Sequence, residues 1–322
     1  MKNYDDTMTI PAEDFFIPLE LLDDEVATHP HFEPPALKVC DFEVVKKPLF
    51  HQDRSPQANF RGAVRPIDPK IGGLLTRKDN DAALSIVGSE YHTVQNHDAY
   101  EAMWDVLTPL LPPSALRGVQ VTEYSEREGA FNRIDVDFPH HCITLEPKNG
   151  SMTLLSLGVT ALIPHGDSSP RFLAYAKDAM CDNIIPLGEY AAPNTRRTAN
   201  YTFVALQETL RKDVTGFRKD VEVMRQWAET PMTTLEFEGL LNSHGFSATD
   251  RSKLSEHFET ESSQRGETVW CGVATLTAWA THDDLFYVKG SASTGEAASG
   301  LTQRLFKVSQ IIHSPSFKGV LS

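Results

Sequence analysis

The segment Phe131-Asn-Arg-Ile-Asp-Val-Asp-Phe138 alternates apolar and polar residues with a period of two. The segment before it, Val119-Gln-Val-Thr-Glu-Tyr124, alternates in the same way. Because successive side chains of a strand point to opposite faces, this pattern predicts antiparallel strands with one face exposed. Residues 152–163 are more continuously apolar, which favours a central strand of the same sheet. Residues 174–185 follow, and we expect a short helix there.

Upstream of these strands the sequence predicts further β-structure. Candidate strands lie within Val39–Phe50, at Gly73–Arg77 and at Ala83–Val87. Gly88-Ser-Glu90 is typical of a tight turn in which Gly88 supplies a positive φ. We expect Tyr91–Gln95 to be the returning strand of a hairpin across this turn.

A helix is expected directly after this hairpin. Asn96 can cap it, because its side-chain oxygen can accept a hydrogen bond from an unpaired backbone N–H. Pro109 is expected to end it. The apolar residues between them fall at helical spacing: Tyr100, Met103, Trp104 and Leu107.

Helical spacing dominates the last third of the chain. Across residues 201–229 the apolar positions recur every three or four residues, and Pro231 ends the run. Thr233 and Glu236 have capping-box spacing for a helix that ends near His244-Gly245. Further helices are expected at 248–259, 267–281 and 298–312. The predicted class is therefore α+β, with an antiparallel sheet and packed helices in a hairpin–helix–sheet–helix core, followed by a helical C-terminal region.

Charge is distributed unevenly along the chain. The formal net charge is −14, and residues 1–36 hold nine acids against one lysine. Residues 37–78 hold nine bases against four acids, and residues 193–225 hold seven bases against four acids. The sequence thus predicts an acidic N-terminal arm at 1–36, a core at 37–230 and a helical region at 231–322. The arm is either a solubility feature or a segment that covers a basic groove or docks a partner.

Composition narrows the class of protein. Of the 322 residues, 40% are hydrophobic and 23% charged, as is ordinary for a globular protein. The four cysteines form no C-x-x-C pair, which favours reduced thiols in a cytoplasmic protein. No apolar run approaches the roughly 20 residues of a membrane span, and the acidic start differs from that of a signal peptide. The sequence contains none of the common nucleotide-binding or hydrolase motifs, so we expect neither cofactor nor metal.

Two short stretches combine residues used in metal chemistry. Pro139-His-His-Cys142 groups three soft ligands, but neighbouring strand residues point to opposite faces, which favours an ordinary loop. Asp135 or Asp137 followed by Glu146-Pro-Lys148 matches the spacing with which restriction-type nucleases hold Mg²⁺. Pro147 weakens that interpretation, because proline cannot donate to a sheet ladder. The alternative is that these acids lie on the solvated face of a strand.

The long helix at 201–229 offers a different chemistry. It carries Arg211, Lys212, Arg218, Lys219 and Arg225, and Arg196-Arg197 precede it. Arginine forks bind phosphates, and Tyr201 or Tyr175 offers a ring on which a base can stack. The competing interpretation is a solvated helix whose cations pair with Glu208 and Glu222. The candidate nucleic-acid-binding residues are Arg77, Lys78, Arg196, Arg197, Arg211 and Lys212.

Three stretches resemble the motifs of a known family, in the same order. They are Val87-Gly-Ser-Glu-Tyr-His-Thr-Val-Gln-Asn96, Met180-Cys-Asp-Asn183, and Gly266-Glu-Thr-Val-Trp270 with Leu276-Thr-Ala-Trp-Ala280. Over about residues 37–312 the chain is similar to the phage- and plasmid-like proteins catalogued as domain of unknown function 932. The order of elements in that family also resembles the core of Rad52-type single-strand annealing proteins.

The resemblance implies a phage- or plasmid-type protein that binds single-stranded DNA along a basic groove, forms homo-oligomers such as rings, and uses neither ATP nor metal. We therefore expect a non-enzymatic, recombination-associated protein in the host cytoplasm, with no membrane partner. Two alternatives stay open. One is a Mg²⁺-dependent nuclease that uses Asp135 or Asp137 with Glu146 and Lys148. The other is an interaction protein that acts through its acidic arm.

Overall fold

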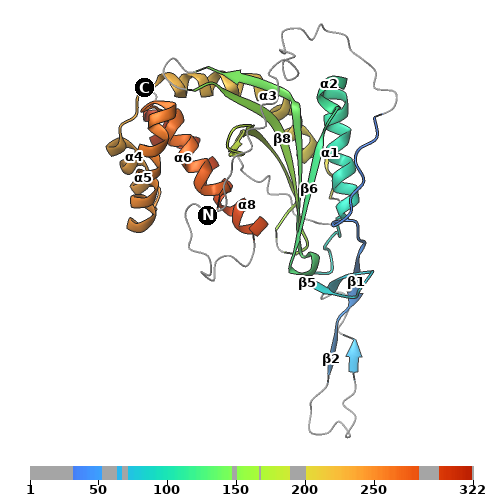
Figure 1. Cartoon of the computed structure of the whole chain (residues 1–322). Helices are drawn as coiled ribbons and strands as arrows, with labels where there is room; N and C mark the ends of the chain where they lie inside the picture. Colours follow the sequence, from blue (N-terminus) through green and yellow to red (C-terminus); the bar gives the residue numbers. More distant parts are fainter. Residues whose placement is uncertain are drawn as a thin grey trace, which may run out of the picture.

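The computed structural model describes residues 32–52, 64–66, 72–146, 151–166, 168–188, 201–282 and 297–320. In these ranges the chain has the predicted α+β fold, with antiparallel sheets and with most of its helices after residue 203 (Figure 1). Most buried side chains of the predicted regions 37–230 and 231–322 belong to one continuous hydrophobic core. Within the described part of the chain, no helix is long and apolar enough to cross a membrane.

Five antiparallel strands form the main sheet, in the order β10, β9, β8, β7, β6. Their bounds are β6 Gln120–Glu126, β7 Phe131–Leu145, β8 Thr153–Pro164, β9 Arg171–Asp178 and β10 Ile184–Pro186. The central strand is β8, as its apolar sequence predicts. Strand β6 pairs with β7 from Phe131 to Asp137, and β7 runs on past that point beside β8.

Strand β6 keeps one exposed face, as its alternation predicts, whereas residues 132–136 of β7 are buried on both faces. On one face the apolar side chains pack under α1 (Asn96–Leu110) and α3 (Val204–Glu229), as where Trp104 meets Phe138 edge-on. On the other face Arg133 of β7 donates to Thr302 of α8 (Ala297–Ile312), and Figure 1 shows α8 on the side of the sheet away from α1. The prediction is wrong for β7 because Arg133 pairs with Asp135 at 2.9 Å, and this pairing lowers the cost of burying the two charged groups.

Residues 174–185 form β9 and β10 rather than the predicted helix. Alanine-rich sequence favours a helix, but burial within the sheet overrides that weak preference. Tyr175 of β9 lies over Gly158 of β8, where a Cβ atom would come within 2.1 Å of the tyrosine ring. Because Tyr175 is almost fully buried in this position, it is not available to stack on a base.

Residues 139–142 lie within β7 and not in the predicted loop. The pairing of β7 with β8 shifts register between Phe138 and Cys142, as at a β-bulge. The ring of His141 packs on Phe217 of α3, with a centroid distance of 5.8 Å. Burial and the nearby Arg218 guanidinium lower the pKa of His141 to about 4, so this ring is neutral at physiological pH. His141 is therefore a packing residue of the sheet–helix contact.

A smaller sheet in the order β1, β4, β5 lies at one end of the main sheet (Figure 1). Its strands are β1 Val44–Pro48, β4 Gly73–Arg77 and β5 Ala83–Val87, which match the predicted segments. Two short strands, β2 Phe50–Gln52 and β3 Val64–Pro66, pair with each other beyond it.

The turn at residues 88–90 forms, but two details predicted around it are wrong. The N–H of Tyr91 donates to the carbonyl of Gly88, yet Gly88 has no positive φ. Residues 91–95 form no strand, because their side chains bind other parts of the fold. The hydroxyl of Tyr91 accepts from the N–H of Gly166, and the Gln95 amide bonds both backbone groups of Val44. Strand β5 pairs with β4 instead.

Asn96 is a buried core residue and not the predicted helix cap. The cap position of α1 is Gln95, which makes no capping side-chain hydrogen bond. The Asn96 amide nitrogen donates to the carbonyl of Cys40 at 3.0 Å. Its oxygen accepts from Asn132 of β7 and lies 3.1 Å from a ring nitrogen of His165. Asn96 thus ties the start of α1 to the segment before β1 and to the main sheet.

Replacing Asn96 with alanine is expected to cost about 3 kcal/mol of unfolding free energy, since it removes the hydrogen bonds of several buried groups. A capping role would cost only about 1 kcal/mol. Urea unfolding measures the difference. His97→Ala, at an exposed position in the same turn, is the control and should leave stability nearly unchanged. A loss of 1 kcal/mol or less for Asn96→Ala would contradict the buried-network account.

Helices α4, α5, α6 and α8 lie where the sequence predicts helices, whereas α2, α9 and a 3₁₀ turn were not predicted. α1 continues through Pro109 and ends one residue later. α4 begins with the predicted capping box, in which Thr233 and Glu236 bond each other's backbone N–H. The bounds are α2 Pro113–Leu116, a 3₁₀ turn at Arg127–Gly129, α4 Thr234–Ser243, α5 Ala248–Arg265, α6 Val269–Thr281 and α9 Pro315–Val320.

Candidate nucleic-acid interface

Helix α3 has 26 residues and packs its apolar side on the main sheet. Its buried side chains recur at the predicted three- and four-residue spacing: Leu206, Leu210, Val214, Phe217, Val221, Met224 and Ala228. Near its start, the Gln207 side chain donates to the Ala102 carbonyl of α1 at 2.9 Å. These contacts fix the orientation of α3 and direct its polar side to solvent.

Four cations on the polar side of α3 are exposed: Arg211, Lys212, Arg218 and Lys219. Among the described residues none of them forms an ion pair. The competing prediction paired the cations of this helix with Glu208 and Glu222. Glu222 pairs with Arg225 instead, whose guanidinium also donates to the carbonyl of Thr144 in β7. Within the described part of the chain, no carboxylate competes with an external anion for the other four cations at ion-pair distance.

The spacing places the cations of α3 in two rows. Helical residues seven positions apart lie nearly on one face and about 10.5 Å apart along the axis. Arg211 and Arg218 share a row with Arg225, and this row borders β7. Lys212 and Lys219 form the second row, farther from the sheet. This arrangement presents repeated positive charge along one direction, which suits a chain of phosphates.

The opposite flank of α3 is acidic. Asp213 lies so close to Gly188 that a Cβ atom there would come within 2.9 Å of the carboxylate. Burial raises the pKa of Asp213 to about 6, with Lys212 opposing the shift and Asp220 adding to it. Burial also raises the pKa of Asp220, although His313 opposes this shift. The two flanks of the helix therefore carry charge of opposite sign.

Asp213→Asn is expected to stabilise the protein at pH 7.5 and to leave its stability nearly unchanged near pH 4. The folded-state pKa lies above the unfolded value, so the stability that the protonated carboxyl contributes is lost as pH rises through about 6. Partial solvent exposure screens the penalty, and we expect a gain of about 1 kcal/mol at the higher pH. Thermal melts at the two pH values measure it. An equal change at both values would contradict the account.

Arg77 and Lys78, at the end of β4, are neutralised by acidic neighbours. The Arg77 guanidinium bonds the Asp79 carboxylate through two nitrogens and lies over the ring of Phe42. Lys78 pairs with Glu43 of the segment before β1. Among the described bases of residues 37–78, Lys47, Arg77 and Lys78 are thus each paired with an acid, and Arg77 and Lys78 are weaker phosphate ligands than their sequence suggests.

The structure does not bring the candidate residues together in one groove. In Figure 1 the smaller sheet with Arg77 and Lys78 lies at the lower end of the molecule, whereas α3 lies at the upper end. Arg196 and Arg197 lie outside the described residues. Arg211 and Lys212 are adjacent on α3 and share its surface with Arg218 and Lys219. Arg218 and Lys219 are among the bases predicted on this helix but not among the candidate site residues. They follow Arg211 and Lys212 by seven residues, and this spacing could have added them to the candidates.

Asp135 and Asp137, the strand acids of the nuclease alternative, are already engaged by protein cations and hydroxyls. Asp135 is buried, is paired with Arg133, and accepts from Thr160 at 2.6 Å. Asp137 accepts from the Tyr175 hydroxyl at 2.6 Å and from the Lys177 ammonium at 3.0 Å. Glu146 follows the end of β7, and Lys148 lies outside the described residues. Among the described residues, no group of three His, Cys, Asp or Glu side chains is arranged to hold a metal.

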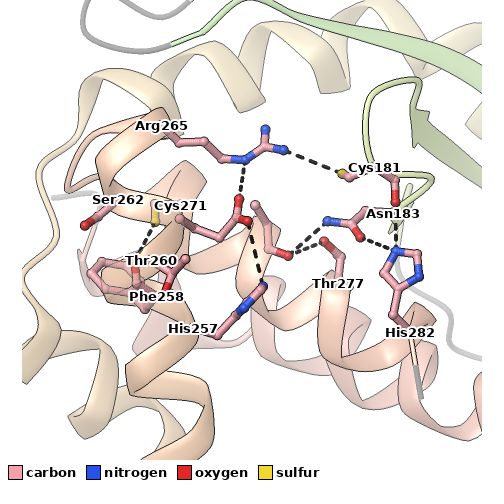
Figure 2. Close-up of polar contacts among 12 residues, drawn as sticks. Cys181, Asn183, His257, Phe258, Thr260, Ser262, Arg265, Cys271, Thr277 and His282 are labelled. Carbon is pink, nitrogen blue, oxygen red and sulfur yellow. Dashed lines mark hydrogen bonds and ion pairs between the residues drawn. The ribbon is translucent and has the colours of Figure 1, made fainter. Parts of the chain in front are cut away.

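The Met180-Cys-Asp-Asn183 motif forms the turn between β9 and β10 and is held by α5 and α6 (Figure 2). Asn183 donates to the Ala274 carbonyl of α6 and contacts a ring nitrogen of His282, which also bonds the Cys181 carbonyl. Arg265, at the end of α5, reaches the Cys181 sulfur. Through Cys181 and Asn183 the motif therefore fixes the helical region to the sheet, while Met180 and Asp182 are exposed.

A comparison with family models, with curated proteins and with solved structures gives no match for this chain. The resemblance in the three motifs accordingly stays a prediction. In the structure the motifs supply internal contacts, through Tyr91, Gln95, Asn96 and Asn183. The four exposed cations of α3 that form no ion pair among the described residues lie outside those motifs.

Proposed function

We propose that this chain binds single-stranded DNA through the exposed side of α3, with phosphates lying along Arg211, Lys212, Arg218 and Lys219. One observation carries the proposal: a chain with a net charge of −14 exposes four cations on one helix that form no ion pair among the described residues. An unpaired arginine or lysine gains more from a phosphate than a paired one, which must first lose its own carboxylate.

The arginine row is suited to phosphates by its chemistry as well as its charge. A guanidinium presents a fork of donors that can bond two phosphate oxygens, whereas an ammonium acts as a point charge. Such contacts carry no sequence information, so we expect binding that depends little on base sequence. Arg196 and Arg197, which precede α3 in the chain, stay candidate DNA-binding residues from the sequence alone. Arg77 and Lys78 are expected to contribute little.

The wider proposal is a strand-annealing-like, recombination-associated protein that acts without catalysis, as a homo-oligomer in the cytoplasm. Its support is the order of the three motifs, together with the engaged state of Asp135 and Asp137. All four cysteines are free thiols, and Cys40 and Cys271 are buried. Burial raises the pKa of each of these two thiols to about 12, so they are protonated and unreactive. Such thiols are compatible with a reducing compartment.

The acidic arm stays a separate prediction, since residues 1–31 lie outside the described residues. Its described end is held against α1. Phe32 packs on Trp104 with a centroid distance of 5.2 Å, and the Tyr100 hydroxyl donates to the Pro35 carbonyl.

Labelled single-stranded DNA, incubated with the protein with and without Mg²⁺, tests the proposal. We expect retardation of the DNA in both conditions and no cleavage. Cleavage that requires Mg²⁺ would support the nuclease alternative. Neither retardation nor cleavage would leave the interaction protein as the remaining account and would overturn the proposal.

Arg211→Gln combined with Arg218→Gln is expected to weaken binding of single-stranded DNA about tenfold near 0.1 M salt, because two phosphate contacts are lost. The matched control is Lys47→Gln combined with Lys78→Gln, which removes the same net charge from two paired lysines. We expect the control to change affinity by about twofold or less. Equal losses in the two proteins would show that net charge, and not the α3 surface, controls binding.

A further inference from the structure

A row of aromatic rings runs from the protein surface into the core at the start of α3. His92 stacks on Tyr201 with a centroid distance of 5.9 Å and an interplanar angle of 24°. Tyr201 meets Phe203 edge-on at 5.5 Å, and Phe203 stacks on Phe172 of β9 at 6.2 Å. Phe172 is buried, whereas His92 is exposed. One face of the His92 ring lies on Tyr201, and His92 is the outermost ring of the row.

The position of His92 is fixed by its neighbours in the chain. The hydroxyl of Tyr91 accepts from the N–H of Gly166, Val94 is buried, and Gln95 bonds both backbone groups of Val44. His92 itself makes no side-chain hydrogen bond among the described residues. Its ring is therefore held by stacking on Tyr201 and by the anchored backbone. A ring in this setting loses little freedom when a second flat group stacks on it.

The row of rings lies at the same end of α3 as the first cations. Arg211 follows Phe203 by eight residues, which corresponds to about 12 Å along a helix. That distance spans about three to four phosphates of a stacked strand, at 3.4 Å each. His92 lies two ring contacts farther out, at 5.9 and 5.5 Å, so a strand whose base stacks at His92 needs a few more nucleotides to place phosphates at Arg211 and Lys212.

We propose that the outer face of His92 is a stacking site for an unpaired nucleobase, which would make the α3 surface select single strands over duplex. This inference rests on the proposed function and adds its substrate class. In a duplex the bases stack on each other and are not available to a surface ring, whereas an unpaired base gains from stacking on an aromatic side chain. The phosphates supply most of the affinity and the base supplies the selectivity.

The test compares oligothymidine with an abasic strand of equal length, which has the same phosphates but no bases. The proteins are the parent, His92→Ala and His92→Phe. We expect the parent to bind oligothymidine about tenfold more tightly than the abasic strand. His92→Ala should bring this ratio close to one, and His92→Phe should keep it near the parent's. The salt dependence of binding should be the same in all three proteins, because no phosphate contact changes.

The outcomes separate the two proposals. A parent that binds both strands equally overturns the stacking site and leaves the α3 phosphate surface standing. A ratio in His92→Ala that equals the parent's also overturns it, since stacking would then occur elsewhere. A parent that binds neither strand overturns both proposals. The melting temperature of each protein serves as the folding control. Because His92 is exposed, we expect this temperature to be the same in the parent and in both variants.

Discussion

Arg265→Ala is expected to lower the free energy of unfolding by about 4 kcal/mol, because it leaves a buried carboxylate without its cation. The Arg265 guanidinium lies 3.1 Å from the Asp178 carboxylate, whose side chain is 1% exposed. It also bonds Glu261 at 2.7 Å and the Thr153 hydroxyl at 3.2 Å. One side chain therefore joins α5 to β8 and to the end of β9.

Two further variants identify the cause of the expected loss. Arg265→Lys keeps the charge but loses the fork that reaches several partners at once, so we expect an intermediate loss. Arg265→Met combined with Asp178→Leu removes both charges and should recover much of the stability. Arg225→Ala, at a half-exposed position on α3, controls for the loss of an arginine. Denaturant unfolding measures all four, and a loss under 1 kcal/mol for Arg265→Ala would contradict the account.

Gly158→Ala is expected to cost about 3 kcal/mol, which is large for the addition of one methyl group. The added Cβ would lie 2.1 Å from the Tyr175 ring, far inside contact distance. The ring cannot withdraw easily, because Tyr175 is buried and its hydroxyl donates to Asp137 at 2.6 Å. The main sheet must therefore distort at its central strand.

A second glycine and a double variant test this explanation. Gly88→Ala should be nearly neutral, since nothing lies within 4 Å of its added Cβ and Gly88 has no positive φ. Tyr175→Ala destabilises by leaving a cavity, but it also removes the clash. The losses of Gly158→Ala and Tyr175→Ala should therefore add to clearly more than the loss of the double variant. Additive losses would show that the two residues do not collide.

The main helices of this protein can be predicted from the sequence, because the patterns that specify them involve residues close together in the chain. The spacing of Phe203, Leu206 and Leu210 predicts α3, and Thr233 with Glu236 predicts the start of α4. Strands β6, β7 and β8 are readable for the same reason, through a period of two or a continuous apolar run.

The errors arise where contacts distant in sequence override local signals. Ala174 and Ala176 favour a helix but lie in the main sheet. Asparagine is a common helix-capping residue, but Asn96 instead bonds Cys40 and Asn132. No local pattern shows that Arg133 bonds Thr302 or that Asp135 accepts from Thr160. Buried polar networks of this kind depend on partners that only the folded chain brings together.

The candidate site was only partly predictable for a related reason. Composition places the basic excess in 37–78 and 193–225, but it does not show which cations have partners. Lys78 is paired with Glu43, across 35 residues of sequence, and Arg211 is unpaired among the described residues. Pairing decides how much charge a surface offers to a ligand, and it is a property of the fold.

The salt dependence of single-stranded DNA binding tests the central claim most directly. Affinity is measured at several salt concentrations for the parent, for Arg211→Gln with Arg218→Gln, and for Lys47→Gln with Lys78→Gln. For single strands the logarithm of affinity falls with the logarithm of salt by about 0.7 per phosphate contact. We predict that the α3 variant flattens this slope by about 1.4 and that the control keeps the parent's slope. Equal slopes in the parent and the α3 variant would contradict the claim that α3 holds the phosphates.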